Sequence, residues 1–105
     1  MDGDFFDALS NPYRRQIVRM LKWGNYSVNE ITKALEISQP SVSRHLDVLK
    51  KANIVVAERR ANQIIYSLNL YVMQEFVGKM VEFLDDMKDL KEVRKYESNK
   101  DAYNN

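Results

Sequence analysis

The sequence predicts a mainly α-helical domain with one two-stranded β-hairpin, in the element order α-α-α-α-β-β-α. Three observations carry this prediction. Apolar residues recur at helical spacing in four segments before residue 52 and again after residue 69. Serine or asparagine precedes most of these segments, as at the capped start of a helix. Between residues 54 and 68 the pattern changes to β-branched and alternating residues.

The first two helices are marked by short apolar stripes and a capping residue. Residues 4–9 (DFFDAL) form one or two amphipathic turns. Asn11 can cap a second helix over about 12–22, because Pro12 suits the first helical position. Gly24 is available for a left-handed cap at the end of this helix.

The next two helices have the spacing of a helix-turn-helix. Ser27 and Glu30 predict a capping box at the start of a helix over 28–35. Ser38 can cap a fourth helix after a turn of about three residues. The predicted buried face of that fourth helix consists of Val42, Leu46 and Leu49. Two short helices in this arrangement predict a helix-turn-helix.

A hairpin and a long helix complete the predicted domain. The segments IVVAERR and QIIYSL flank Ala61-Asn62, and Asn62 tolerates the positive φ that a two-residue loop demands. This hairpin is the predicted wing. Asn69 can cap a last helix that runs to about residue 94, within one domain over residues 1–95. We expect the polar tail over 96–105 to lie outside that domain. The apolar stripe of the last helix consists of Met73, Phe76, Val77, Met80, Val81, Leu84, Met87 and Leu90.

Composition narrows the classes of function. The 105 residues include no cysteine, which removes disulfides, thiolate metal sites and cysteine nucleophiles. With one histidine, no glycine-rich phosphate loop and no inward pair of carboxylates, the chain offers no recognisable catalytic set, and we expect no enzyme. It also lacks an apolar stretch of about 18 residues and a basic start, which predicts a cytoplasmic protein.

Charge is unevenly divided along the chain. Residues 1–9 carry a net charge of −3, residues 10–63 carry +6, and residues 64–105 carry −2. A basic middle between acidic ends is typical of a nucleic-acid-binding face that is separate from another surface.

The outward side of the fourth helix fits DNA. Its first turns hold small polar residues that favour a close approach to a groove, at the expense of intrinsic helix stability. We expect Arg44 to contact a guanine, with Gln39, Ser41 and Ser43 reading or framing base edges. Phosphate contacts are predicted for Lys50, Lys51, Arg59, Arg60 and either Arg14 or Arg15. His45 is predicted to be a packing or phosphate-contacting residue and not a metal ligand.

Three stretches carry a family resemblance. The segments LSNPYRRQIVRMLKWG, ISQPSVSRHLDVLKKANIV and ERRANQIIYSL resemble the opening helix, the recognition helix and the wing of the ArsR/SmtB family of bacterial winged helix-turn-helix repressors. The resemblance covers about residues 5–84 and implies a homodimeric transcriptional repressor that binds an inverted repeat. It also implies that the first and last helices together form the interface between the two subunits. The apolar stripes supply the candidate interface residues Phe5, Phe6, Leu9, Met73, Phe76, Val77, Met80, Leu84 and Met87.

Departures from the family pattern point to one branch. Ser27 and Asn29 stand where metal-sensing members have cysteines. Of the positions that match last-helix ligands, which are Leu70, Val72, Phe83 and Asp86, only Asp86 can bind a metal. We therefore expect no metal and no cofactor. The chain looks most like SdpR-type autorepressors, which implies release of DNA through sequestration by a membrane protein.

One alternative stays open. Ala61-Asn62 replaces the usual Gly-Arg of the family's wing, which leaves the minor-groove contact open or passes it to Arg60. The altered wing and the small net charge also suit a winged-helix module that binds proteins and has lost DNA binding.

Overall fold

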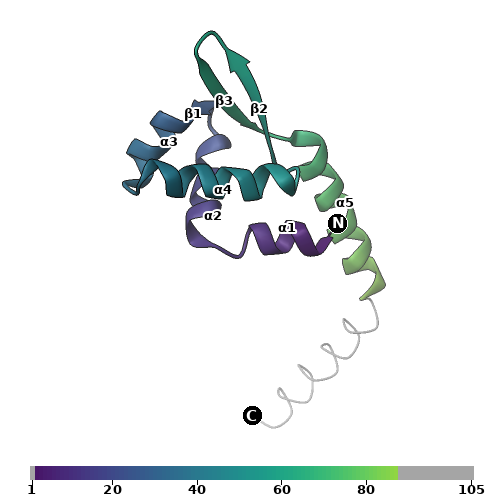
Figure 1. Cartoon of the computed structure of the whole chain (residues 1–105). Coiled ribbons are helices and arrows are strands. Elements are labelled where there is room, and N and C mark those ends of the chain that lie inside the picture. Colours follow the sequence, from purple (N-terminus) through teal and green to yellow (C-terminus); the bar gives the residue numbers. More distant parts are fainter. Residues whose placement is uncertain (1, 88–105) are drawn as a thin grey trace, which may run out of the picture. The chain divides into compact units, whose positions relative to one another are not determined.

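The structure of the chain is a computed structural model that describes residues 2–87 (Figure 1). Residues up to Met73 form one compact unit, and a second unit begins at Gln74, within the last helix. The elements are α1 (Asp2–Ala8), α2 (Pro12–Leu21), β1 (Tyr26–Ser27), α3 (Val28–Leu35), α4 (Gln39–Lys51), β2 (Val55–Arg60), β3 (Gln63–Leu68) and α5 (Leu70–Asp86). The predicted end of the last helix near 94, its residue Leu90, the domain limit at 95 and the tail over 96–105 lie outside the described residues.

The caps predicted for α2 and α3 are confirmed. Asn11 Oδ1 accepts hydrogen bonds from the backbone N–H groups of Tyr13 at 2.8 Å and Arg14 at 3.2 Å. Ser27 Oγ accepts from the Glu30 N–H at 3.2 Å, while Glu30 Oε1 accepts from the Ser27 N–H at 3.0 Å. These bonds satisfy N–H groups that have no partner inside the helix, and so fix where each helix begins.

The end of α2 differs from the prediction. Gly24 does not adopt a positive φ, so the predicted left-handed glycine cap is wrong. Instead the helix is closed by tight bonds in its last turn: the N–H of Lys22 donates to the carbonyl of Val18 at 3.1 Å, and the N–H of Trp23 donates to that of Met20 at 3.1 Å. The bond from Trp23 to Met20 spans three residues, as in a 3₁₀-helix. Bonds of this kind satisfy the last carbonyls of a helix without a left-handed residue.

The sheet has one strand more than the predicted hairpin. Its strand order is β1-β3-β2, and both pairings are antiparallel. The hairpin pairs Val55 with Leu68 at its base and Arg60 with Gln63 at its tip, and it projects from the helices as a wing (Figure 1). β1 holds two residues, which is too short a segment to show an alternating pattern in sequence.

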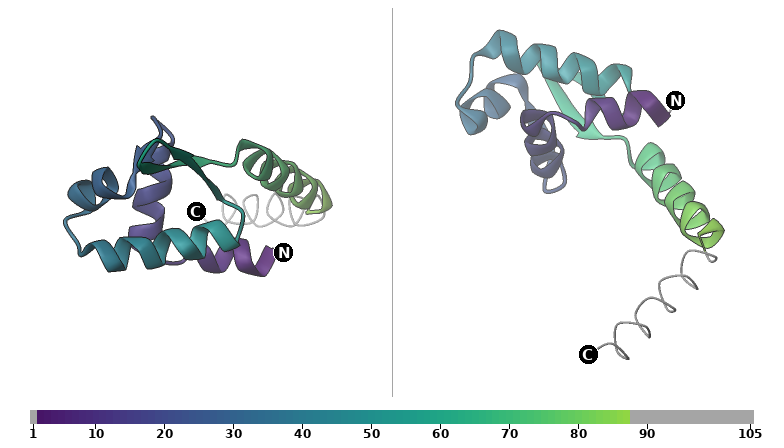
Figure 2. Two further views of the ribbon diagram at one scale, coloured as in Figure 1. Left: turned by 45° about the horizontal axis from the view of Figure 1, so that its top comes forward. Right: turned by 90° about the horizontal axis from the view of Figure 1, so that it is seen from below.

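The core lies on the inner side of α4. The side chains of Val42, Leu46 and Leu49 have no exposed surface, as predicted from their spacing. They pack within a core to which the other elements of the first unit contribute Phe5, Ala8, Ile17, Leu21, Ile31, Ile54, Val55 and Tyr66. Figure 2 shows α1 running beside the C-terminal half of α4, and α2 crossing beneath it. α4 is therefore the central element of this unit.

Among residues 2–87, three residues other than glycine adopt a positive φ, and each lies between two elements. They are Glu36 between α3 and α4, Asn53 between α4 and β2, and Ala61 at the wing tip, with φ of 57°, 61° and 53°. At Asn53 the backbone forms a Schellman motif, because the Asn53 N–H donates to Lys50 O and the Ile54 N–H donates to Leu49 O.

The wing loop places its positive φ on the residue before the predicted one. Asn62 was expected to adopt it, and that expectation is wrong, because Ala61 does so. In a two-residue loop that links strands of right-handed twist, some turn types require a positive φ only at the first position. An alanine there is strained, since its Cβ crowds the following carbonyl.

Replacing Ala61 by glycine should therefore stabilise the protein. We expect Ala61→Gly to raise the free energy of unfolding by about 1 kcal/mol, measured by urea denaturation. Asn62→Gly is the matched control, because Asn62 has no positive φ to relieve, and it should give no gain. Equal effects of the two substitutions would contradict the assignment of the strain to Ala61.

Candidate nucleic-acid interface

A tight turn between α3 and α4 sets the direction of α4. Glu36 closes α3 in the left-handed conformation, and its N–H donates to Thr32 O at 3.0 Å. Ser38 then begins α4, because its Oγ accepts a hydrogen bond from the Ser41 N–H at 3.3 Å. Glu36 to Ser38 thus form the three-residue turn that the sequence predicts for a helix-turn-helix.

The side of α4 opposite its buried face is exposed. Gln39, Pro40, Arg44, Asp47 and Lys51 are all exposed. Ser41 and Ser43, which were predicted to read or frame base edges, are half-buried. The N-terminal half of the helix therefore presents short polar side chains and one long cation to solvent.

Hydrogen bonds on this surface stay within the first turns of α4. The Ser38 hydroxyl donates to Ser41 Oγ at 2.8 Å, which leaves the Ser41 hydroxyl proton available. Arg44 Nε donates to Pro40 O at 3.4 Å. This bond holds the guanidinium over the start of the helix and uses one of its five N–H groups. The terminal nitrogens of Arg44 remain suited to a bidentate contact with a guanine.

The wing adds two exposed arginines. Arg59 and Arg60 are both exposed and lie near the hairpin tip. Arg60 Nη2 lies 3.5 Å from Glu58 Oε2, and both side chains are well exposed, at 63% and 69%. An ion pair so open to water is worth little, so Arg60 can exchange Glu58 for a phosphate at small cost. At the other end of α4, Lys50 and Lys51 are exposed in its last turn.

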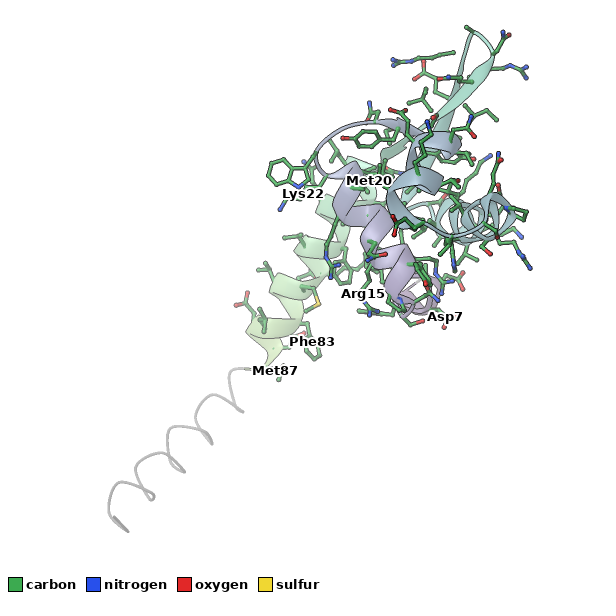
Figure 3. The ribbon with its side chains drawn as sticks, turned by 90° about the vertical axis from the view of Figure 1, so that its left-hand side faces the viewer. Asp7, Arg15, Met20, Lys22, Phe83 and Met87 are labelled. Atoms are coloured by element: carbon green, nitrogen blue, oxygen red, sulfur yellow. The ribbon has the colours of Figure 1, made fainter. Side chains whose placement is uncertain are left out.

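Arg14 and Arg15 bond to the end of α1. Arg14 Nε donates to Ala8 O at 2.5 Å and its Nη2 to Asp7 O at 3.2 Å, while Arg15 Nη1 donates to Leu9 O at 2.9 Å. Figure 3 shows Arg15 and Asp7 at the end of α2 near α1, and Lys22 at the opposite end. The sequence predicted phosphate contacts for these arginines and missed this structural role. Side-chain bonds to carbonyls six or seven residues away leave no periodic signal.

His45 packs against the start of α2. Its ring centroid lies 5.8 Å from that of Tyr13, and its Nδ1 lies 3.4 Å from Arg14 Nη1. Burial lowers the pKa of His45 below the ordinary histidine value, and the cations of Arg14 and Arg44 lower it further. The geometry is that of a packing residue. A phosphate contact by His45 stays a prediction.

The candidate dimer residues differ in their exposure. Phe5 is only 5% exposed and belongs to the core of its own unit, which leaves little of it for a partner. Phe6 is 55% exposed, and Leu9 is half-buried. On α5, Val77, Met80 and Leu84 are exposed, and Met73, Phe76 and Met87 are half-buried.

Residues 2–87 offer neither a metal site nor a membrane span. In this part of the chain no group of three or more His, Cys, Asp or Glu side chains is placed to hold a metal ion. None of the helices described there is long and apolar enough to cross a membrane.

Comparisons with known proteins agree with this geometry. The family model described as "Bacterial regulatory protein, arsR family" matches residues 11–56. The transcriptional repressor SdpR of Bacillus subtilis is 39% identical over 83 residues, which span 79% of this chain and 92% of SdpR.

Solved structures agree in fold. HlyU from Vibrio cholerae superposes with a TM-score of 0.62 at 29% identity, covering 75% of this chain and 89% of HlyU. The homodimeric winged helix-turn-helix DNA-binding domain of Mb0332 from Mycobacterium bovis gives a TM-score of 0.66 at 27% identity, covering 81% of this chain and 78% of that domain. The chain therefore belongs to the arsR family of bacterial regulatory proteins and is a DNA-binding transcriptional repressor with a winged helix-turn-helix fold.

Proposed function

We propose that two copies of this chain bind an inverted repeat in double-stranded DNA. Each copy would place α4 in the major groove, with the two helices about 34 Å apart, one turn of DNA. The observation that carries this proposal is the division of α4 into two faces. Val42, Leu46 and Leu49 are completely buried, which leaves the polar N-terminal side of the helix exposed to meet a duplex.

The exposed side chains suggest how the work is divided. Arg44 would contact a guanine through its terminal nitrogens, and Gln39 would read or frame the next base edge. Ser41 and Ser43 are half-buried and short, so they suit close contacts at the groove edge. Phosphate contacts would fall to Lys50 and Lys51 and, on the wing, to Arg59 and Arg60. Arg14 and Arg15 would contact phosphates only through those N–H groups that are not already bonded to the carbonyls of α1 and Leu9.

The wing tip would enter or border the minor groove through Arg60. Ala61 and Asn62 form the loop itself and carry no charge. Arg60 stands directly before the loop and forms an exposed ion pair with Glu58. An arginine at a narrow minor groove gains from the enhanced negative potential there.

A dimer would form through the terminal helices. α5 buries none of its described side chains, although Val77, Val81 and Leu84 are apolar and 52–61% exposed. Exposed apolar stripes of this length on small domains commonly mark interfaces. Phe6 of α1, also exposed, would join them. The homodimeric state given for the Mb0332 domain supports a dimer here as well.

Autorepression and release by a membrane protein stay predictions. Both were inferred from likeness to SdpR-type repressors. No described residue or compared protein here supplies evidence of a membrane partner. We further infer that the protein acts in the cytoplasm, because its proposed ligand is chromosomal DNA.

Arg44→Ala should lose sequence discrimination. We expect at least about tenfold weaker binding to a duplex that the unaltered protein selects from genomic fragments, because a bidentate guanine contact is worth about 1–3 kcal/mol. Binding would be measured by electrophoretic shift at fixed low salt. Arg19→Ala is the matched control. Arg19 is an exposed arginine in the last turn of α2, so this substitution removes the same charge at a position away from the proposed interface.

Equal losses in the two variants would assign Arg44 to general charge attraction and not to base recognition. If the unaltered protein shifts no duplex even at low salt, the protein-interaction module becomes the better description.

A charge placed in the apolar stripe of α5 should break the dimer. We expect Leu84→Glu to raise the dimer dissociation constant at least about tenfold, because an unpaired carboxylate would be buried at the interface. Sedimentation equilibrium measures this constant. Gln74→Glu adds the same charge at an exposed polar position of α5 and should leave the constant close to that of the unaltered protein. A monomer in all three cases would contradict the proposed dimer.

A further inference from the structure

One guanidinium connects α1, α2 and α4. Arg14 extends from the first turn of α2, donates to Ala8 O and Asp7 O at the end of α1, and reaches His45 of α4 with its third nitrogen. Both carbonyls belong to the last residues of α1, where no N–H further along the helix is available to them. Asp7 O also accepts from the Ser10 N–H at 3.1 Å and the Ser10 hydroxyl at 2.6 Å, so Arg14 adds a further bond there and supplies the bond to Ala8 O. Arg14 thus satisfies the end of one helix and contacts the side of another.

The contact with His45 requires a neutral ring. Arginine is always a donor, so His45 Nδ1 must offer its lone pair and the ring proton must sit on Nε2. The ring also lies at 30° to Tyr13, with 5.8 Å between centroids. The charged groups that act on it are cations, Arg14 from α2 and Arg44 from α4 itself. From α1, Asp7 reaches this cluster through its backbone carbonyl, by way of Arg14.

We propose that Arg14 and neutral His45 form a proton-sensitive joint that holds α4 in a fixed direction against the end of α1. His45 is then a positioning residue for α4, and a proton is the ligand that releases it. The inference rests on the proposed function in one respect, namely that α4 is the helix that reads DNA. Because α1 is a candidate dimer helix, the joint would also couple the dimer surface to that helix.

Protonation acts against this joint for a simple reason. It removes the acceptor that Arg14 faces and places a third cation between Arg14 and Arg44. The pKa of His45 in the folded protein is lowered, first by burial and then by these two arginines. Between the ordinary value of 6.5 and the lower folded value, the unfolded chain binds more protons than the folded one. The stabilisation is complete above pH 6.5 and is lost as the pH falls toward the folded pKa.

If His45 instead contacts a DNA phosphate, the pH dependence of DNA affinity has the opposite sign. A histidine that binds a DNA phosphate acts as a cation, and its protonation strengthens binding. DNA affinity would then rise as the pH falls. In the proposed joint, affinity falls with pH, because α4 loses its fixed direction.

The first experiment uses the fact that His45 is the single histidine of the chain. Its ring protons can be followed by NMR from pH 4.5 to 8 without ambiguity. We expect a titration midpoint below 6.5 in the unaltered protein and a higher midpoint in Arg14→Gln. Arg15→Gln is the matched control, because Arg15 bonds to Leu9 O and not to His45. Its midpoint should equal that of the unaltered protein. Equal midpoints in all three would overturn the proposal.

A second variant covers the case in which Arg14→Gln does not fold. His45→Asn keeps an acceptor near the position of Nδ1 and cannot titrate. In the unaltered protein we expect the unfolding constant to rise, by up to tenfold per pH unit, as the pH falls below 6.5 toward the folded pKa. The same curve should be flatter in His45→Asn. We also expect the α4 amide resonances to shift with the His45 midpoint. Curves of equal slope would contradict the joint.

The third measurement concerns DNA. With a duplex that the unaltered protein selects, we expect affinity to fall between pH 7.5 and 5.5, and the fall to be smaller in His45→Asn. Since no other side-chain type of the chain ordinarily titrates in this range, the difference reports on His45. An affinity that rises in the unaltered protein and not in the variant would assign His45 to phosphate. If no duplex binds, the proposed function fails. The first two experiments still show whether Arg14 and neutral His45 form the proposed joint.

Discussion

Burial of one side of α4 is the constraint on which the rest of the structure depends. Val42, Leu46 and Leu49 contribute three fully buried side chains from a helix of 13 residues. At 100° per residue, burial of this side compels the opposite side to face solvent. The core therefore fixes which residues can meet DNA, even though none of the core side chains would touch it. Burial of each of these side chains is worth about 1.5 to 3 kcal/mol, so turning the helix to another face would cost several times that amount.

Much of the fold was predictable because helix starts have a side-chain signature. Ser27 with Glu30 specifies a capping box in four letters, and the structure confirms it. The backbone conformations that carry no such signature were missed or misassigned. The sequence favoured a positive φ at Asn62, but Ala61 adopts it. Gly24, which could adopt a positive φ without strain, does not do so. In both places the tertiary pairing of strands or the tightening of the last helical turn decided the geometry, and propensity did not.

For the candidate site, the sequence predicted exposure better than contact. The outward side of α4 follows from periodicity, so Arg44 and Gln39 were placed correctly on the surface. The bonds of Arg14 and Arg15 to α1 join residues that share no periodic relation, and only the folded backbone brings them together. The same holds for His45, whose neighbours Tyr13 and Arg14 stand about thirty residues earlier. The contacts of His45 with Tyr13 and Arg14 could therefore not be predicted from the sequence.

The separation of the two faces of α4 affects how such a protein can change over generations. On the outward face, the side-chain hydrogen bonds of Ser41 and Arg44 stay within the helix's own first turns, so altering those two side chains leaves the packing beneath them in place. A duplicated copy of the gene could acquire a new target sequence through a few substitutions there while the scaffold stays the same. Substitutions that change the DNA sequence recognised would then cost little stability, whereas substitutions in the buried face would destabilise the fold.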